Sequence, residues 1–287
     1  MSQIAVVTDS VASIPENLME RLGIQTVAYY VHCGQEVLRD LITIQRDEFL
    51  SRLSDAAVLP TTACPGPGDY FEKYQKLISE GFSEILSLHI TSRGSAAYQA
   101  ACVAKTMIAS QYPDIRIEVV DTLNVSLCQG WMAVESARAA LAGASLDDLL
   151  VMVRGMLPVT RMIQTADTLK YLYMGGRIGL AKRLMGAMLN VKPLIGMKDG
   201  VIVSLGMAHS RTQTYNQMAA YISDAVGQGK VKVAYVHAGA LEETLKLKKI
   251  VESRLNVVES MIAELSPALA VHTGPGTTGL CFYPVRG

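Results

Sequence analysis

The chain has 287 residues, with 26 basic and 26 acidic side chains, and therefore carries no net charge. Binding to nucleic acids or to anionic membrane surfaces needs an excess of positive charge, so the composition argues against both classes of protein. Half of the residues are hydrophobic and 18% are charged, which provides for a large core and excludes a disordered chain. The length predicts two domains or one large α/β unit.

Targeting signals and cysteine usage point to one compartment. No run of 18 uncharged apolar residues occurs, so we expect no membrane-spanning helix and no stable membrane insertion. The first residues lead directly into a strand pattern without a basic segment, which argues against a signal peptide. Five widely spaced cysteines, an odd number, are typical of reduced thiols. We therefore expect a cytoplasmic protein.

Strand and helix patterns alternate through the first half. Residues 59–68 hold three prolines and two glycines and cannot form a helix or a central strand. Strands separated by helices of this length predict βαβ units and a parallel sheet flanked by helices. The predicted strands are 4–8, 25–31, 84–90 and 115–120, and the predicted helices are 15–22, 45–53, 69–79, 95–111 and 127–142.

Four segments rich in hydroxyl groups are expected at the carboxyl ends of these strands, where parallel sheets bind ligands. These segments are 8–10, 61–68, 91–95 and 121–126.

The second half combines its elements differently and predicts a mixed sheet with helices. Ser145 is expected to cap a helix, and Asp199-Gly200 to turn a hairpin. We place the boundary between residues 145 and 160, which gives an N-terminal α/β domain over 1–155 and a C-terminal α/β domain over 156–287. The predicted strands are 160–165, 192–197, 201–208 and 232–237, and the predicted helical segments are 169–174, 180–189, 212–226 and 241–255.

Residues 274–279 match the pattern G-x-G-x-x-G and follow a predicted strand over 268–272. In a dinucleotide site this pattern must open a helix. Only eight residues follow Gly279, and they predict a strand and a tail, so we reject a dinucleotide site. A glycine-rich loop can still bring backbone N–H groups close to an anion.

Catalytic and metal-binding patterns are weak. A Ser-His-Asp hydrolase could be assembled from Ser95, His272 and Asp9 or Asp121, but the G-x-S-x-G elbow is missing, and capping of the next helix explains Ser95 equally well. The five histidines are too widely separated to predict a metal site. Gly175-Gly176-Arg177 ends a helical pattern; we favour a helix C-cap, with contact of Arg177 to an anion or a partner as the alternative.

Seven short segments stand out in chain order: Thr8-Asp9-Ser10, Thr62-Ala63-Cys64-Pro65-Gly66-Pro67, Ser92-Arg93-Gly94-Ser95-Ala96-Ala97-Tyr98, Val120-Asp121-Thr122, Gly175-Gly176-Arg177, Leu189-Asn190-Val191-Lys192-Pro193 and His272-Thr273-Gly274-Pro275-Gly276. Together they resemble the motifs of the DegV family of fatty-acid-binding proteins, over essentially the whole chain. The second segment corresponds to Thr-Ser-Gln-Pro-Ser-Pro and the third to Ser-x-Leu-Ser-Gly-Thr-Tyr. Thr62 and Ser95 keep their hydroxyls, whereas Ala63, Cys64, Gly94, Ala96 and Ala97 depart from the pattern and leave the choice of ligand open.

The resemblance implies one long-chain fatty acid, such as palmitate, bound between two α/β domains, with no cofactor. It implies that Thr62 and Ser95 bind the carboxylate, with His272, Thr273 and Gly274 nearby and Thr61, Asp9, Ser10 and Asp121 as supporting residues. It further implies a separate fatty acid kinase as partner, which forms the acyl phosphate while this chain does no chemistry. A small-molecule enzyme, either a hydrolase using Ser95 and His272 or a phosphotransferase subunit, is the alternative.

Physical chemistry makes this function plausible. Burying a C16 chain at about 0.8 kcal/mol per CH₂ offers on the order of 12 kcal/mol before ordering costs. Ten of the fourteen methionines lie between Met132 and Met218, and we expect several of them to line an apolar tunnel; an ordinary methionine-rich core is the alternative. A kinase must reach the carboxylate, so we expect Arg177 and Arg211 on a docking face around the tunnel mouth, with solvated surface arginines as the alternative.

Overall fold

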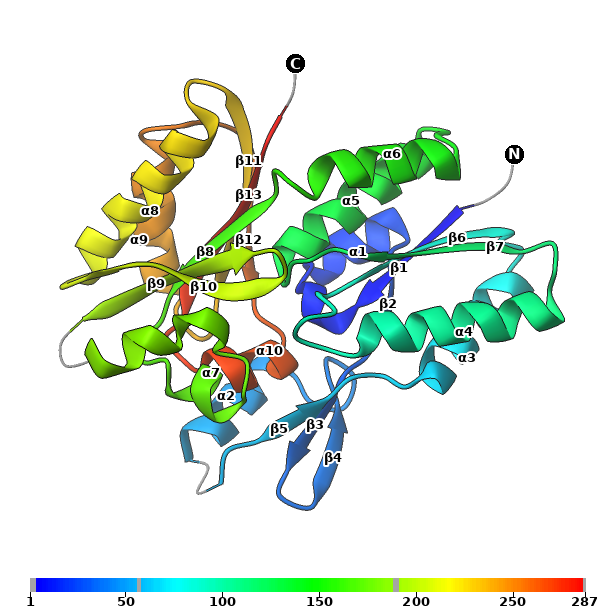
Figure 1. Ribbon diagram of the computed structural model, residues 1–287, viewed down its shortest axis with the longest axis horizontal. Coiled ribbons are helices and arrows are strands. Elements are labelled where there is room, and N and C mark those ends of the chain that lie inside the picture. Colours follow the sequence, from blue (N-terminus) through cyan, green and yellow to red (C-terminus); the bar gives the residue numbers. More distant parts are fainter. Residues whose placement is uncertain (1–3, 56–57, 188–190, 286–287) are drawn as a thin grey trace.

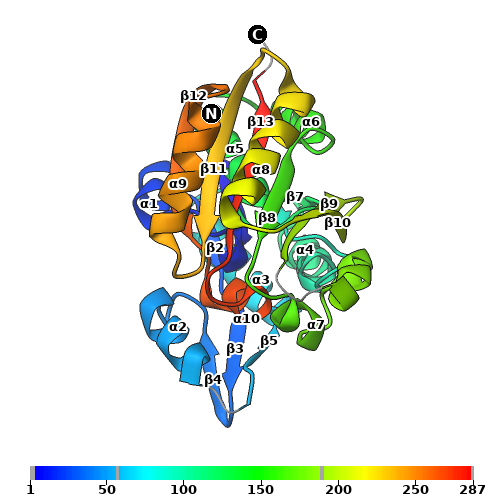
Figure 2. The ribbon, with the colours of Figure 1, turned by 90° about the vertical axis from the view of Figure 1, so that its left-hand side faces the viewer.

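The computed structural model describes residues 4–55, 58–187 and 191–285. Figure 1 shows two sheet systems side by side, with a smaller sheet below them, and Figure 2 shows the same elements from the side. The last helix of the first sheet system ends at Met156, and the first strand of the second begins at Arg161.

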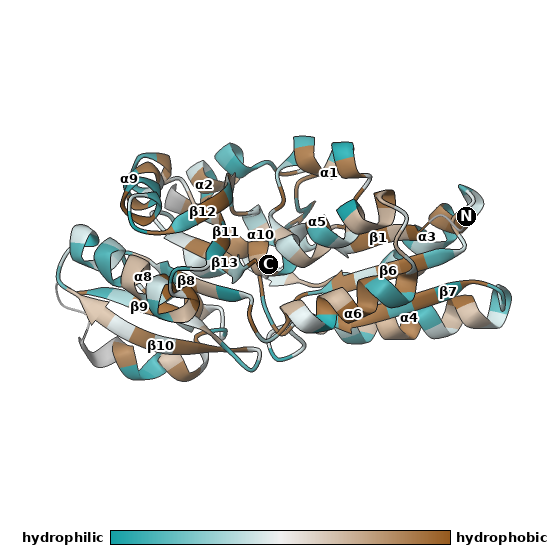
Figure 3. Cartoon of the chain, turned by 90° about the horizontal axis from the view of Figure 1, so that it is seen from above, coloured by the Kyte–Doolittle hydropathy of each residue, from teal (hydrophilic) through white to brown (hydrophobic). Residues whose placement is uncertain are grey.

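A four-stranded parallel sheet, in the order β2-β1-β6-β7, forms the N-terminal part. The strands β1 and β6 are buried on both faces, as expected for a parallel sheet between two layers of helices, and Figure 3 shows the sheet mostly in the colour of hydrophobic residues. Helices α3 and α4 cover one face, and α1, α5 and α6 cover the other. This confirms the predicted parallel sheet with flanking helices. The strands are β1 (Ile4–Asp9), β2 (Gln25–Val27), β6 (Glu84–His89) and β7 (Arg116–Asp121), and the helices are α1 (Glu16–Leu22), α3 (Pro67–Ser79), α4 (Ala97–Gln111), α5 (Leu127–Leu141) and α6 (Leu146–Met156), with a 3-10 turn η1 (Ser10–Ala12) after β1.

A small antiparallel sheet, in the order β4-β3-β5, lies beside α2 (Arg46–Asp55). The continuous strand predicted over 25–31 is wrong, because the chain leaves the parallel sheet after Val27 and enters this sheet at Tyr30. Between them, the backbone N–H of Tyr29 donates to Ser10 Oγ and its carbonyl accepts from Asp40, and these bonds replace strand pairing. The strands are β3 (Tyr30–Cys33), β4 (Glu36–Arg39), which the sequence analysis missed, and β5 (Thr61–Ala63).

The edge strand β5 corrects the predicted position of Thr62. The proline-rich segment pairs only on one side, with β3, which is how such a segment can join a sheet. Thr62 therefore lies on an antiparallel edge strand and not at the carboxyl end of a parallel strand next to Ser95, as predicted.

The second half builds a six-stranded mixed sheet in the order β10-β9-β8-β13-β11-β12, in which only β11 and β12 run parallel. Helices α8 and α9 pack on one of its faces. The predicted hairpin turns at Asp199 and Gly200, whose φ angles of 50° and 79° are those of a type I′ turn. A 3-10 helix, η2 (Gly179–Ala187), stands in place of the predicted helical segment 180–189, whose last two residues lie outside the described ranges. The strands are β8 (Arg161–Thr165), β9 (Lys192–Lys198), β10 (Val201–Ala208), β11 (Lys230–His237), β12 (Asn256–Glu264) and β13 (Thr278–Pro284). The other helices are α7 (Lys170–Met174), α8 (Arg211–Val226) and α9 (Leu241–Glu252).

A short helix, α10 (Pro267–Thr273), stands where the sequence predicted a strand over 268–272. The run is apolar except for His272, and such runs do not distinguish a buried helix from a strand. Two contacts tie the start of α10 to the N-terminal part: Asp40 Oδ1 accepts from the backbone N–H of Ala268 at 3.0 Å, and Ser13 Oγ accepts from that of Ser266 at 3.2 Å. These two bonds hold α10 where it contacts α2, β3 and β5.

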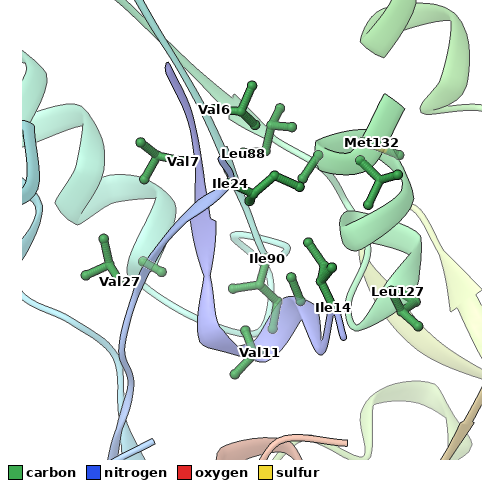
Figure 4. Close-up of a cluster of buried hydrophobic side chains, with 14 of the residues drawn as sticks. Val6, Val7, Val11, Ile14, Ile24, Val27, Leu88, Ile90, Leu127 and Met132 are labelled. Carbon is green, nitrogen blue, oxygen red and sulfur yellow. The ribbon is translucent and has the colours of Figure 1, made fainter. Parts of the chain in front are cut away.

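The largest hydrophobic cluster runs from the parallel sheet to α10 and β13. Figure 4 shows its part around β1, where Val11 and Ile90 lie near Ile14, with Leu127 and Met132 of α5 on the right of the view. Val11 and Ile90 also line the cavity described next, so this core forms one of its walls.

Candidate functional site

A cavity of about 470 Å³ is lined by residues of the small sheet, the mixed sheet and α10, and by the segments that follow the strands of the parallel sheet. Its volume lies in the usual range of ligand sites. Its apolar wall includes Val11, Ile90, Val125, Met162, Met197 and Leu269. Thr62, Ser95, Arg177 and His272 contribute polar groups.

The prediction that several methionines line an apolar tunnel is largely wrong. Of the methionines between Met132 and Met218 whose side chains the structure describes, only Met162 and Met197 line the cavity. Met132 and Met218 are fully buried in hydrophobic clusters, and Met174 is 62% exposed. The side chains of residues 185 and 188 lie outside the described part of the chain. Most of the described methionines in this range therefore pack in closed hydrophobic clusters or lie at the surface.

Thr62 and His272 form the first polar pair of the cavity, with Thr62 Oγ1 2.8 Å from His272 Nε2. Burial, together with the positive charge of Arg177, lowers the pKa of His272 to about 4, so the imidazole is neutral at pH 7. A neutral imidazole with its proton on Nε2 donates to Thr62 Oγ1 and leaves the hydroxyl proton of Thr62 free for a ligand. Within the described residues, His272 Nδ1 has no hydrogen-bond partner.

Gly175 makes room for this histidine. A Cβ atom at Gly175 would lie 2.3 Å from His272 Nδ1. The backbone N–H of Gly175 donates to Tyr171, and that of Arg177 donates to Leu172, which closes the end of α7. The predicted C-cap is therefore confirmed, and the cap also packs against the His272 ring.

Ser95 and Tyr29 form the second polar pair, with 2.6 Å between their hydroxyl oxygens. Ser95 Oγ also accepts from the backbone N–H of Ala97 at 3.3 Å, but the N-cap of α4 is Ala96 and not, as predicted, Ser95. Burial and the negative charge of Asp9 raise the pKa of Tyr29, so its phenol keeps its proton and can donate to Ser95. The hydroxyl proton of Ser95 is then available to a ligand. The sequence analysis missed Tyr29, which no motif marked.

Asp121 holds the loop that carries Ser95. Its carboxylate accepts from the backbone N–H of Ser92 at 3.2 Å and from that of Leu123 at 2.9 Å. The same loop contacts the hairpin of the other half, because Thr91 Oγ1 donates to the carbonyl of Gly200 at 3.0 Å.

Asp9 and Ser10 lie behind the cavity and do not line it. Burial alone would raise the pKa of Asp9, but attraction and a hydrogen bond from His89, at 2.8 Å, together with bonds from Ile90 and Tyr70, lower it. Ser10 Oγ donates to Asp40 Oδ2 at 2.6 Å, and Asp40 anchors α10. Both residues therefore support the scaffold of the site.

The remaining predicted residues fall in different places. Thr273 lines the cavity, whereas Thr61 is exposed on β5 and does not. Gly274 has φ +76°, and a Cβ there would lie 2.1 Å from the ring of Tyr171, so the turn after α10 requires glycine. The departures Ala63, Cys64, Gly94 and Ala96 all line the cavity, whereas Ala97 is buried in the core.

The two arginines predicted for docking differ in their surroundings. Arg177 is exposed, lines the cavity and donates to the carbonyl of Gly175 at 2.8 Å. Arg211 lies in a separate groove between α8 and α9, where it forms an ion pair with Asp167 at 2.9 Å and donates to the carbonyl of Gly276 at 2.8 Å. Only Arg177 is therefore beside the cavity.

The geometry does not assemble the hydrolase triad. Ser95 bonds to Tyr29 and not to His272, while Asp9 pairs with His89 and Asp121 with backbone N–H groups. In residues 4–55, 58–187 and 191–285, no three His, Cys, Asp or Glu side chains gather as metal ligands, and no helix is long and apolar enough to cross a membrane.

The fold and the cavity define an α/β protein with a ligand cavity shared by the elements of both halves. The model of the DegV family, described as a family of uncharacterised proteins, matches residues 3–285. The chain belongs to the DegV family. A DegV domain-containing protein of Streptomyces coelicolor is 30% identical over 278 residues, covering 96% of this chain and 97% of the relative.

Solved structures agree with this assignment. A DegV family protein from Thermus thermophilus, described by its fatty acid binding, is 30% identical with a TM-score of 0.91, over 99% of this chain and 100% of the other. A stearic-acid-binding protein from Eubacterium ventriosum is 28% identical with a TM-score of 0.90, over 99% and 98%. DegV of Bacillus subtilis, described as a fatty acid binding protein, is 25% identical with a TM-score of 0.88, over 99% and 100%.

Proposed function

We propose that this protein binds one long-chain fatty acid in the cavity, with the carboxylate between Thr62 and Ser95. The observation that carries the proposal is that each of these hydroxyls has a neighbour, His272 or Tyr29, able to donate to it, so that each can donate its own proton. A buried carboxylate without donors is very costly, and these two hydroxyls can meet that need.

The rest of the ligand is an acyl chain. Val11, Ile90, Met162 and Leu269 offer it an apolar wall, and each CH₂ that leaves water contributes about 0.8 kcal/mol. Relatives of 30% and 28% identity that are described as binding a fatty acid support this choice of ligand. The cavity then lies between two units, 1–155 and 156–287.

The protein acts as a cytoplasmic carrier that uses no cofactor and performs no chemistry. It presents the carboxylate to a separate fatty acid kinase, which forms the acyl phosphate. Support comes from Arg177, which is exposed at the polar part of the cavity, so that a partner can reach this end. Arg177 serves as a cation of the docking face beside the cavity, and Arg211 extends this face to the separate groove between α8 and α9.

Organic extraction of the purified protein, followed by mass spectrometry, tests the proposal. A C14–C18 fatty acid at about one molecule per chain is expected. A protein that contains no fatty acid, binds none and hydrolyses esters would instead favour an enzyme using Ser95 and His272.

A further inference from the structure

Gln164 is a polar side chain among the cavity-lining residues on the strands of the mixed sheet, and the others, Met162, Met197, Val201 and Ile202, are apolar. Gln164 lies on β8, is 5% exposed and lines the cavity, yet its amide forms no hydrogen bond with any described residue. Successive residues of a strand point to opposite faces. Met162 also lines the cavity and Ile163 packs in the cluster beneath α8 and α9, so Gln164 points into the cavity.

The neighbouring strand leaves space for this amide. Gly279 of β13 pairs with Gln164, and a Cβ atom at Gly279 would lie 2.6 Å from Cβ of Gln164. The side chain of Gln164 is therefore not crowded by its partner across the sheet.

Ser126 is a second polar group of the cavity lining without a partner. It is 3% exposed, and its hydroxyl forms no hydrogen bond with the described residues. It precedes α5, which faces the same part of the mixed sheet, because Trp131 Nε1 of α5 donates to the carbonyl of Cys281 on β13 at 3.3 Å. The amide of Gln164, a residue that is 5% exposed, and the buried hydroxyl of Ser126 thus lie in the lining without protein partners, which is unfavourable beside a plain hydrocarbon chain.

We propose that the preferred ligand is an oxygenated long-chain fatty acid, whose in-chain hydroxyl or carbonyl group bonds to Gln164, with Ser126 as a second partner. An amide offers two donors and an acceptor, so it can satisfy either group. This inference rests on the proposed function and specifies its class of ligand. Water held by the two side chains is the competing explanation, and it gives no preference for an oxygenated chain.

Binding of stearic acid and of hydroxystearic acids that differ in the position of the hydroxyl tests this inference. The best hydroxy isomer is expected to bind the wild type at least about tenfold more tightly than stearic acid, or 1.4 kcal/mol. Gln164→Leu should abolish this preference and leave stearic acid bound at least as tightly. Ile163→Val, on the same strand but outside the cavity lining, is the matched control and should keep the preference.

The outcomes separate the two proposals. Stoichiometric binding of stearic acid to the wild type, without a preference for any hydroxy isomer, overturns this inference and leaves the proposed function standing. A preference that persists in folded Gln164→Leu removes Gln164 from the explanation and also overturns it. No binding of any fatty acid overturns both. The comparison of stearic and hydroxystearic acids on the wild type tests the inference even if Gln164→Leu does not fold.

Discussion

Thr62 Oγ1 lies 2.8 Å from His272 Nε2, although 210 positions separate the two residues in the chain. The contact joins the edge strand β5 to the helix α10. It depends on Asp40 and Ser13, which hold the start of α10 against the N-terminal part. One polar group of the site is thus made by both halves of the chain, and the predictions below test what it does.

Removing both hydroxyls should weaken fatty-acid binding. Thr62→Ala combined with Ser95→Ala is expected to reduce the affinity by about 2–4 kcal/mol, since each lost bond to a charged group contributes about 1–2 kcal/mol. Isothermal titration with palmitate measures the change. Thr61→Ala, on the same strand but outside the cavity lining, is the matched control and should bind normally.

The stability of the double variant must be measured beside its affinity. Ser95 accepts a bond from the N–H of Ala97, and loss of such a hydrogen bond costs about 1 kcal/mol. Unchanged affinity in a folded double variant would rule out these hydroxyls as the carboxylate site.

Acid should destabilise the protein through His272. Its pKa is about 4 in the folded chain, whereas an unfolded histidine titrates near 6.5, so the unfolded chain takes up the proton first. The contribution to stability is present above about pH 6.5 and is lost as the pH falls towards 4, by about 3 kcal/mol in total. Denaturation with urea between pH 7 and 5 should therefore show a smaller loss of stability in His272→Gln than in the wild type.

Burial also lowers the pKa of His237, so His237 makes stability fall with pH in the same direction. Because His237 is present in both proteins, the comparison isolates the contribution of His272. An identical pH dependence in the two proteins would contradict the lowered pKa. Because the charge of Arg177 contributes to the shift, an NMR titration should show a higher His272 pKa in Arg177→Gln.

A methyl group at Gly175 should displace the histidine. Gly175→Ala places Cβ 2.3 Å from His272 Nδ1 and is expected to cost about 1–3 kcal/mol of stability and to weaken palmitate binding. Gly155→Ala on α6 has open space around the new methyl group and should stabilise the protein by about 0.4–1 kcal/mol. Thermal melting and titration measure both effects, and similar behaviour of the two variants would show that the ring has room to move.

The docking proposal predicts that binding and phosphorylation respond differently. In Arg177→Ala and in Arg211→Ala, palmitate binding should persist while kinase-dependent formation of acyl phosphate falls at least about tenfold, or 1.4 kcal/mol. Loss of palmitate binding in Arg177→Ala would assign this side chain to the carboxylate site instead. Since Arg211 also bonds to Asp167 and Gly276, a melting curve must show that its variant is folded.

The regular part of the fold could be predicted from the sequence because local patterns decide it. Alternating strands and helices give the parallel sheet, and Asp199-Gly200 gives the hairpin. The split between β2 and β3 could not be predicted, because side-chain and backbone bonds from Ser10 and Asp40 create it. Helix α10 depends on long-range contacts in the same way.

The candidate site could be predicted only where a motif marks it. Thr62, Ser95 and His272 lie in motifs, and all three line the cavity. Tyr29 lies in a segment that predicts a plain strand, and its contact with Ser95 exists only after the chain has turned out of the parallel sheet. Methionine content did not locate the cavity, because the same side chain fills closed cores equally well.

A crystal structure of the protein with palmitate tests the central claim most directly. The account predicts one fatty acid per chain, with its carboxylate oxygens at hydrogen-bond distance, about 2.5–3.0 Å, from Thr62 Oγ1 and Ser95 Oγ, and with its chain against Val11 and Ile90. A carboxylate bound away from both hydroxyls, or a cavity that stays empty at saturating palmitate, would contradict it.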